Sequence, residues 1–155
     1  ADSPLGAKQF YVNMLKKVMA TKTKIKLKGS DHFALNVKDM KRAEKFYTQI
    51  LGFEVIHRTE TQAGLKHIEV DAGNVNIALF ESPVLNLEKA HKTMTEDGYL
   101  HFAFGACYDQ FDSTLKSLKQ NGVIIDGEPR DWGKSVSVYF CDPDDHQLEI
   151  NFVRV

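Results

Sequence analysis

The feature that most constrains the fold is an internal repeat. His32-Phe33-Ala34 recurs as His101-Phe102-Ala103 further along the chain. In both copies an acidic turn follows, and then apolar residues at three- and four-residue steps predict a helix. Three apolar strands separated by turn residues come next. The sequence therefore predicts an α+β fold made of two βαβββ modules.

Local signals place the ends of the two helices. Asp39 precedes the first helical pattern as an N-cap, and Gly52 follows it at the position where helices commonly stop. In the second copy the pattern follows Asp109 and ends before Gly122. Two copies that each leave a sheet face apolar are expected to pack with pseudo-twofold symmetry around a shared cleft.

The repeat divides the chain into four parts. We expect modules at residues 29–82 and 98–155, joined by a linker at 83–97 and together forming one domain. Residues 1–28 predict an amphipathic helix followed by a lysine-rich extension. A basic amphipathic helix is typical of a membrane surface or a partner protein, but we interpret this one as packed on the domain or on a dimer mate.

Composition narrows the choice of partners. The chain has 155 residues, 43% of them hydrophobic, and a formal net charge of -1, so no overall field attracts nucleic acid or an anionic membrane. No apolar run reaches membrane-spanning length. Cys107 and Cys141 are far apart and predict buried, reduced thiols rather than a disulfide framework or a zinc knuckle. We expect a cytoplasmic protein that acts on a small molecule.

Three side chains suggest a metal site. His32 and His101 occupy equivalent positions in the repeat, and Glu149 lies between Leu148 and Ile150 in the last strand. Alternation points this glutamate away from its apolar neighbours, towards either solvent or the cleft. Each residue alone is more often an ordinary strand side chain. Together, two imidazoles and one carboxylate form a set that binds Fe, Mn, Zn, Ni or Co and leaves positions open for substrate.

Longer motifs carry a family resemblance. The two βαβββ modules, the two equivalent histidines, Phe46-Tyr47 with Leu51-Gly52-Phe53, and the run from Tyr139 to Glu149 resemble the vicinal oxygen chelate superfamily. This superfamily includes glyoxalase I, extradiol dioxygenases, fosfomycin-modifying thiol transferases, epimerases and bleomycin-resistance proteins. The resemblance covers about residues 30–153 and implies His32, His101 and Glu149 as metal ligands. It also implies a homodimer.

Departures from the family pattern reduce the number of family activities that fit this sequence. The fourth ligand of glyoxalases and epimerases falls at Ala78, which cannot bind a metal. The three-ligand pattern of the dioxygenases and fosfomycin enzymes remains. No histidine is clearly placed as a dioxygenase acid or base, and the loop at 129–134 does not closely match the potassium-binding loop of a fosfomycin enzyme. Asp145 replaces the usual glycine of the Asp-Pro-Asp-Gly turn, in a left-handed conformation that Asp tolerates.

The resemblance also suggests residues around the substrate. Tyr139 matches a substrate-facing tyrosine that hydrogen-bonds a metal-bound oxyanion, although a core aromatic residue is an equally open interpretation. Arg130 and Lys134 are candidates to neutralise a carboxylate or phosphonate. Ser137 shares a strand face with Tyr139, and Trp132 lies in a glycine-containing loop where it can cover a ligand.

Three functions follow from these observations. The first is a metal-dependent enzyme that chelates adjacent oxygens of a small substrate, either dioxygenase-like or fosfomycin-thiol-transferase-like. The alternative is a metal-free protein of the bleomycin-resistance type that sequesters a drug or metabolite. The third is a scaffold or regulatory dimer with a vestigial site. Whether the modules pair within one chain or exchange between two chains stays open.

Overall fold

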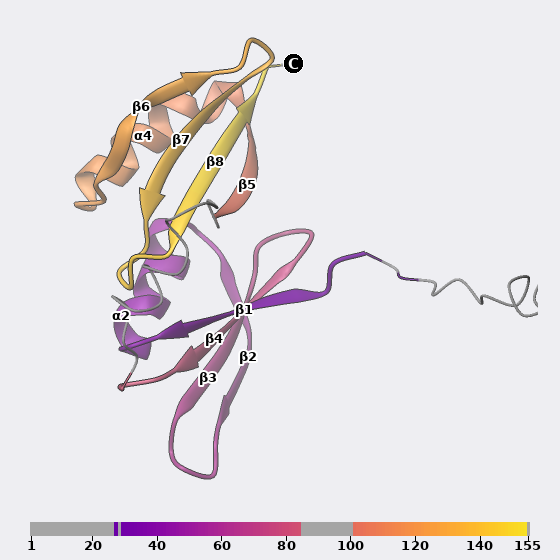
Figure 1. The fold of residues 1–155 in the computed structure, drawn as a ribbon, viewed down its shortest axis with the longest axis vertical. Helices are drawn as coiled ribbons and strands as arrows, with labels where there is room; N and C mark the ends of the chain where they lie inside the picture. Colours follow the sequence, from indigo (N-terminus) through magenta and orange to yellow (C-terminus); the bar gives the residue numbers. More distant parts are fainter. Residues whose placement is uncertain (1–26, 28, 85–100, 155) are drawn as a thin grey trace, which may run out of the picture. The chain divides into compact units, whose positions relative to one another are not determined.

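The computed structural model describes residues 27, 29–84 and 101–154, and the predicted fold of two βαβββ modules is confirmed (Figure 1). The N-terminal helix expected within residues 1–28 and most of the linker at 83–97 lie outside the described residues. The strands and helices described below belong to a compact unit from Asp31 to Val155.

Each module has one strand, one helical segment and three further strands. The first contains β1 (His32–Val37), α2 (Met40–Lys45), η1 (Phe46–Ile50), β2 (Glu54–Glu60), β3 (Lys66–Asp71) and β4 (Asn76–Glu81). The second contains β5 (Phe102–Cys107), η2 (Tyr108–Gln110), α4 (Phe111–Gln120), β6 (Ile125–Asp131), β7 (Ser135–Cys141) and β8 (Gln147–Val153).

The two sheets have the same topology. Their strand orders are β1-β4-β3-β2 and β5-β8-β7-β6. In each, the first and last strands of the module pair in parallel and the other neighbours are antiparallel. Ala34 pairs with Ala78 in the first sheet, and Ala103 pairs with Glu149 in the second. Ala78 and Glu149 therefore occupy the same position of the two modules.

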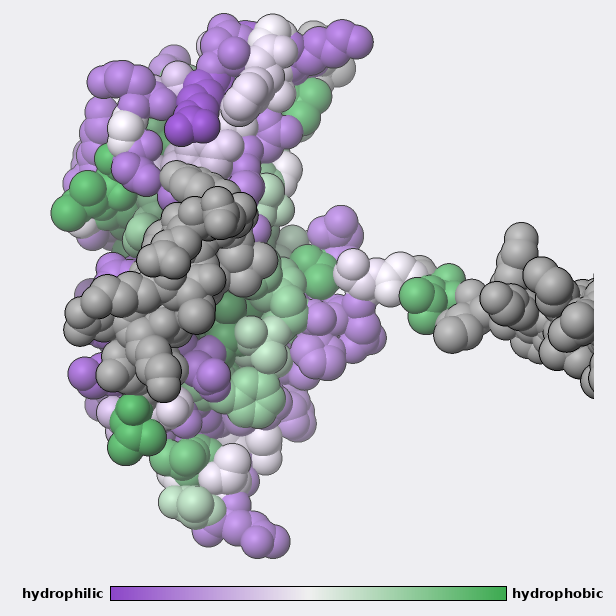
Figure 2. Space-filling view, viewed as in Figure 1, coloured by the Kyte–Doolittle hydropathy of each residue, from purple (hydrophilic) through white to green (hydrophobic). Residues whose placement is uncertain are grey.

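One hydrophobic core joins the modules. Alternation along β1, β3 and β4 buries one face of the first sheet against its helix, and β7 and β8 do the same in the second. The Phe46 and Phe140 rings from the two modules lie 6.5 Å apart. Full burial of such side chains contributes about 1.5–3 kcal/mol each. On the face drawn in Figure 2, green hydrophobic residues are interspersed with purple hydrophilic ones. No described helix is long and apolar enough to cross a membrane.

Two local predictions from the sequence are confirmed. The Asp39 carboxylate accepts a hydrogen bond from the Arg42 backbone N–H at 2.9 Å, as expected of an N-cap. Asp145 has φ of 64° and is the only non-glycine residue with a positive φ in the described part of the chain. Its turn therefore uses the left-handed conformation for which the family pattern has glycine.

Three elements differ in detail from the sequence expectation. The first helix does not stay α-helical to its end but finishes in a π turn, η1. The second begins with a 3₁₀ turn, and Gln110 rather than Asp109 precedes the α-helix. Strand β6 extends to Asp131, so Arg130 lies in a strand rather than in a loop. The pairing of β6 with β7 shifts register between Asp126 and Arg130, which interrupts the alternation that would have revealed the strand.

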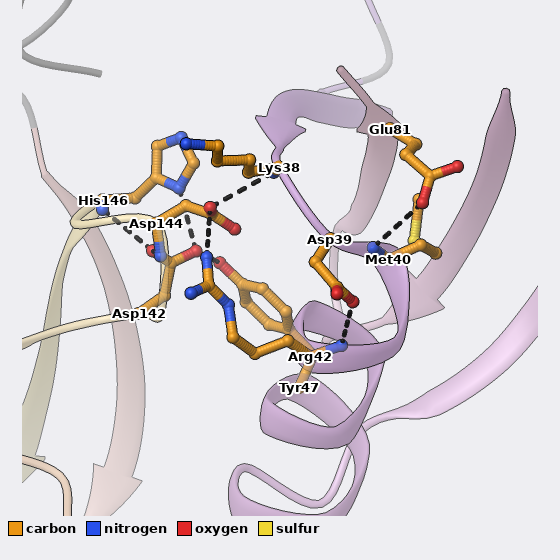
Figure 3. Close-up of polar contacts among 9 residues, drawn as sticks. All are labelled: Lys38, Asp39, Met40, Arg42, Tyr47, Glu81, Asp142, Asp144 and His146. Carbon is orange, nitrogen blue, oxygen red and sulfur yellow. Dashed lines mark hydrogen bonds and ion pairs between the residues drawn. The ribbon is translucent and has the colours of Figure 1, made fainter. Parts of the chain in front are cut away.

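A polar junction connects the first module's helix to the β7–β8 turn (Figure 3). The Tyr47 hydroxyl donates to Asp142 Oδ2 at 2.8 Å, and His146 Nδ1 lies 2.8 Å from the same oxygen. Arg42 donates to Asp144 Oδ1 at 2.7 Å. Both carboxylates are almost fully buried, so these partners offset the cost of removing their charges from water.

The junction shifts two pKa values. Burial raises the pKa of Tyr47 well above its usual value, and the charge of Asp142 adds to the effect. Burial alone would lower the pKa of His146, but the hydrogen bond to Asp142 and nearby negative charges outweigh it, so this pKa is raised. Tyr47 therefore remains a hydrogen-bond donor at neutral pH.

Candidate metal centre

The second module brings together two of the three predicted ligands. Glu149 lies in the middle of β8, where alternation directs Leu148 and Ile150 into the core and the carboxylate to the opposite face of the sheet. His101 immediately precedes β5, the parallel neighbour of β8. The His101 Nε2 atom lies 2.8 Å from Glu149 Oε2. The Glu149 side chain is only 10% exposed and that of His101 28%.

The other carboxylate oxygen of Glu149 is held by a serine. Ser137 on β7 is almost fully buried, and its hydroxyl donates to Glu149 Oε1 at 2.5 Å. The Trp132 indole Nε1–H in turn donates to the Ser137 hydroxyl oxygen at 3.0 Å. Asn151 Oδ1 lies 3.3 Å from the same hydroxyl. The carboxylate is therefore fixed on one side and faces His101 on the other.

Tyr139 borders this pair. It is the cross-strand partner of Glu149, and its ring meets the His101 ring edge to face with centroids 5.7 Å apart. The Arg130 guanidinium carbon lies 5.4 Å from the centroid of the Tyr139 ring. Burial and the charge of Glu149 raise the pKa of Tyr139, while Ser137 and Arg130 act in the opposite direction. The phenol is therefore neutral and able to donate a hydrogen bond at neutral pH.

The third predicted ligand lies apart from the pair. His32 starts β1, its side chain is 48% exposed, and its Nδ1 atom lies 2.7 Å from Asp31 Oδ2. Across the described residues, no three His, Cys, Asp or Glu side chains are arranged to hold one metal ion. A single chain thus assembles His101 with Glu149 and leaves His32 on a separate edge strand.

A cavity adjoins the histidine of the pair. It has a volume of about 550 Å³, and His101 lies in its wall. Phe33 and Phe53 come from the first module, as does the β3–β4 turn, and β5 supplies the remaining wall. The Phe33 and Phe102 rings stack in parallel with centroids 4.2 Å apart. Both residues follow the equivalent histidines directly in sequence.

The remaining predicted residues lie at the β6–β7 turn. Trp132 is 60% exposed, and Lys134 is also exposed. Sequence reasoning missed Arg154, which holds this turn through a bidentate ion pair with Asp131 at 2.7 and 2.9 Å. It also missed Asn151, although two-residue alternation from Glu149 places it on the same strand face. The groups at this turn that the Arg154 side chain contacts are more than twenty residues away, so no local pattern indicates them.

Comparison with known proteins places the chain in a family. Residues 29–150 match the glyoxalase/bleomycin resistance protein/dioxygenase superfamily, and the chain belongs to it. Metallothiol transferase FosB of Staphylococcus haemolyticus is 29% identical over 126 residues, covering 81% of this chain and 84% of FosB. Glutathione transferase FosA of Serratia marcescens is 28% identical over 125 residues, which is 81% of each chain.

Solved structures point to the same branch. The fosfomycin resistance protein FosX of Listeria monocytogenes superposes with a TM-score of 0.68 at 25% identity, over 83% of this chain and 95% of FosX. Its complex with Mn(II) and sulfate gives a TM-score of 0.63 at 25% identity, over 82% of this chain and 93% of FosX. The predicted relationship to fosfomycin-modifying enzymes that depend on a divalent metal is therefore confirmed.

Proposed function

We propose that this protein is a divalent-metal-dependent enzyme that opens the epoxide of a small phosphonate of the fosfomycin class by adding a thiol or water. The observation that carries the proposal is the buried Glu149 carboxylate, fixed by Ser137 and placed 2.8 Å from His101. The names of the metallothiol transferase FosB and the glutathione transferase FosA support thiol addition, and that of the fosfomycin resistance protein FosX supports the substrate class. Cys107 and Cys141 are exposed, so the expectation that they are buried was wrong. Both are free thiols, which supports the proposed cytoplasmic location, where thiols stay reduced.

The donor set fits a divalent first-row metal ion. Imidazole nitrogen and carboxylate oxygen are its usual ligands in sites that keep positions open for substrate. The contact between His32 Nδ1 and Asp31 leaves Nε2 as the ligating atom, an arrangement common among metal-binding histidines. When bound, the ion supplies Lewis-acid stabilisation of negative charge on a substrate oxygen.

A second copy of the chain supplies the third ligand in this proposal. His101 and Glu149 come together within one chain, whereas His32 lies on the separate edge strand β1. A homodimer that places His32 of one copy opposite His101 and Glu149 of the other completes two equivalent sites. The proposal thereby gives the expected homodimer a chemical role.

The residues around the pair act on the substrate. The neutral Tyr139 hydroxyl donates a hydrogen bond to the epoxide oxygen as its carbon–oxygen bond breaks. Arg130, whose guanidinium lies over the Tyr139 ring, supplies positive charge for the phosphonate. With a thiol, the sulfur forms a bond to the epoxide carbon and loses its proton, and the opened oxygen gains one.

Phosphorus NMR of fosfomycin incubated with Mn(II)-loaded protein tests the activity. Glutathione or cysteine as co-substrate, compared with buffer alone, separates thiol addition from hydrolysis. We expect ring opening that chelator abolishes, and His101→Ala is expected to lose both metal and turnover while the exposed His57→Ala keeps both. A wild-type protein that takes up no metal on anaerobic reconstitution would favour the metal-free binding protein instead.

Mixing two inactive variants tests the shared site. His32→Ala and His101→Ala homodimers each lack a ligand in both sites. In a mixed dimer, one site loses both histidines and the other keeps all three ligands. Random mixing therefore restores about one quarter of the wild-type sites. No recovery of metal binding or turnover after co-refolding would place His32 outside the site of its partner.

A further inference from the structure

We infer that Trp132 and Ser137 form a relay that positions the Glu149 carboxylate, so that the β6–β7 turn controls a metal ligand it does not touch. The inference rests on the proposed function and assigns Trp132 to the ligand's support rather than to a ligand-covering lid. Trp132 is the single tryptophan of the chain. Its exposed ring lies outside the core, yet its N–H points inward to a buried hydroxyl.

The hydrogen-bond inventory of Ser137 fixes the direction of the relay. A serine hydroxyl has one proton to donate and lone pairs to accept. The indole N–H is a donor only, so Trp132 occupies a lone pair and leaves the serine proton for an acceptor. Glu149 Oε1 at 2.5 Å is the nearest acceptor, closer than Asn151 Oδ1 at 3.3 Å, and the neighbouring Tyr139 hydroxyl also hydrogen-bonds this serine and carboxylate. Trp132 therefore orients the hydroxyl that orients the carboxylate.

Burial makes this orientation effective. As whole residues Ser137 is 1% exposed and Glu149 8% exposed, so the hydrogen bond between them is shielded from solvent, while the one from the Trp132 ring is part-buried. Hydrogen bonds in series inside a protein strengthen one another, and one to a carboxylate is stronger than one between neutral groups. With Oε1 engaged by Ser137, Oε2 is the oxygen directed to His101.

The turn that carries Trp132 is held in place from outside the site. Arg154 forms the bidentate pair with Asp131 and also donates to the Gly133 carbonyl oxygen at 2.6 Å. The Gly133 backbone N–H donates to the Asp131 carboxylate, and the Trp132 backbone N–H donates to the Ser135 carbonyl oxygen. The hydrogen bond from Arg154, aided by the Gly133 N–H, lowers the pKa of Asp131 to about 2, so this ion pair persists at neutral pH.

Nitrogen-labelled, metal-free protein provides the first test. A single tryptophan gives a single indole N–H resonance, which we expect to move with Ser137→Ala and to keep its wild-type position with Ser137→Thr. Glu149→Gln should also move the resonance in the wild-type background, but not in the Ser137→Ala background. An indole N–H chemical shift that is unchanged by Ser137→Ala would overturn the relay.

Mn(II) affinity, measured by calorimetry, provides the second test. Loss of an outer partner of a metal ligand costs 10–100-fold in affinity, and we expect this range for Ser137→Ala. Trp132→Phe keeps an aromatic ring and loses the N–H, with an expected loss of about fivefold. Because Trp132 acts through Ser137, Trp132→Phe should add nothing in the Ser137→Ala background.

Controls separate the relay from general damage. Ser113→Ala on α4 removes a solvent-exposed hydroxyl that bonds the Gln110 carbonyl, and it should leave Mn(II) affinity unchanged. Additive losses for Trp132→Phe and Ser137→Ala would overturn the relay. A wild-type protein that binds no Mn(II) would overturn the proposed function, while the indole measurement on metal-free protein would still decide the relay.

Discussion

The two modules share a topology but differ at matching positions around their first strands. In the second, Glu149 stands opposite Ala103 and faces His101, while in the first the equivalent position is Ala78, opposite Ala34. The strand pairs two residues further along also differ. In the second module this pair is Ser137 and Asn151, and Ser137 supports Glu149, whereas in the first it is His67 and Phe80, whose rings stack with centroids 4.1 Å apart. The two modules therefore share a scaffold, and within the described residues only the second contains a supported ligand pair.

The largest expected effect tests this difference directly. Glu149→Gln removes the ligand charge and should weaken Mn(II) binding by about 100-fold or more. Glu69→Gln makes the same chemical change in the first module, at the position opposite Ala78, which is equivalent to Tyr139. We expect it to keep wild-type affinity. Equal losses in the two variants, measured by calorimetry, would remove the distinction between the modules.

The next largest effect concerns the polar junction between the first module's helix and the β7–β8 turn, to which the two modules contribute different residues. Tyr47 of the first helix reaches Asp142 of the second module. Tyr47→Phe removes one hydrogen bond to a buried charged group and should lower the free energy of unfolding by about 1.5–3 kcal/mol in urea denaturation. The control is Tyr108→Phe, because Tyr108 is 38% exposed and the variant keeps the ring that Arg154 contacts. We expect it to lower the free energy of unfolding by less than about 1 kcal/mol. A larger loss of stability for Tyr108→Phe than for Tyr47→Phe would contradict the view that the junction stabilises the fold.

A smaller effect depends on pH. The folded pKa of His146 is raised above its usual value, so the charged imidazole stabilises the fold at pH below about 6.5 and this contribution is lost as pH rises through the folded pKa. His146→Gln should therefore cost more stability at about pH 5.5 than at about pH 8.5. Urea midpoints at the two pH values measure the difference. A larger cost at the higher pH would show that the sign is wrong.

The smallest effect lies within the first module. Arg58 on β2 forms a bidentate ion pair with Glu44 on α2 at 2.8 and 2.5 Å. The Arg58 side chain is 57% exposed, and water and salt screen such pairs, so Glu44→Gln should cost below about 1 kcal/mol. A loss in urea denaturation larger than that of Tyr47→Phe would mean that contacts within a module outweigh the junction between modules.

Local patterns predicted much of the fold. The repeat and the Asp39 cap follow from residue type and spacing, the left-handed Asp145 follows from the family resemblance, and the structure contains all three. The contact between His101 and Glu149 agrees with the ligand pattern, although the complete ligand set stays a prediction. The sequence had suggested Ser137 only as a residue lining the cleft, and Trp132 only as a residue that covers a ligand.

What the sequence did not indicate depends on contacts distant along the chain. Tyr47 and Asp142 are 95 positions apart, and Arg154 and Asp131 are 23 apart. Neither pair leaves a periodic signal. The Trp132 N–H bond to Ser137 depends on how the turn is held, which follows from the Arg154 ion pair rather than from any local motif.

The shared core has a consequence for how the protein unfolds. Residues from both modules belong to one buried cluster, and the Phe46 and Phe140 rings approach each other across the boundary. Separating the modules would expose apolar surface on both, so neither half is expected to persist alone. Calorimetry should record one cooperative transition, and hydrogen exchange of β4 and β8 amides should report a common opening free energy. The unfolding curve would then show a single transition, although the sequence contains two copies of the module.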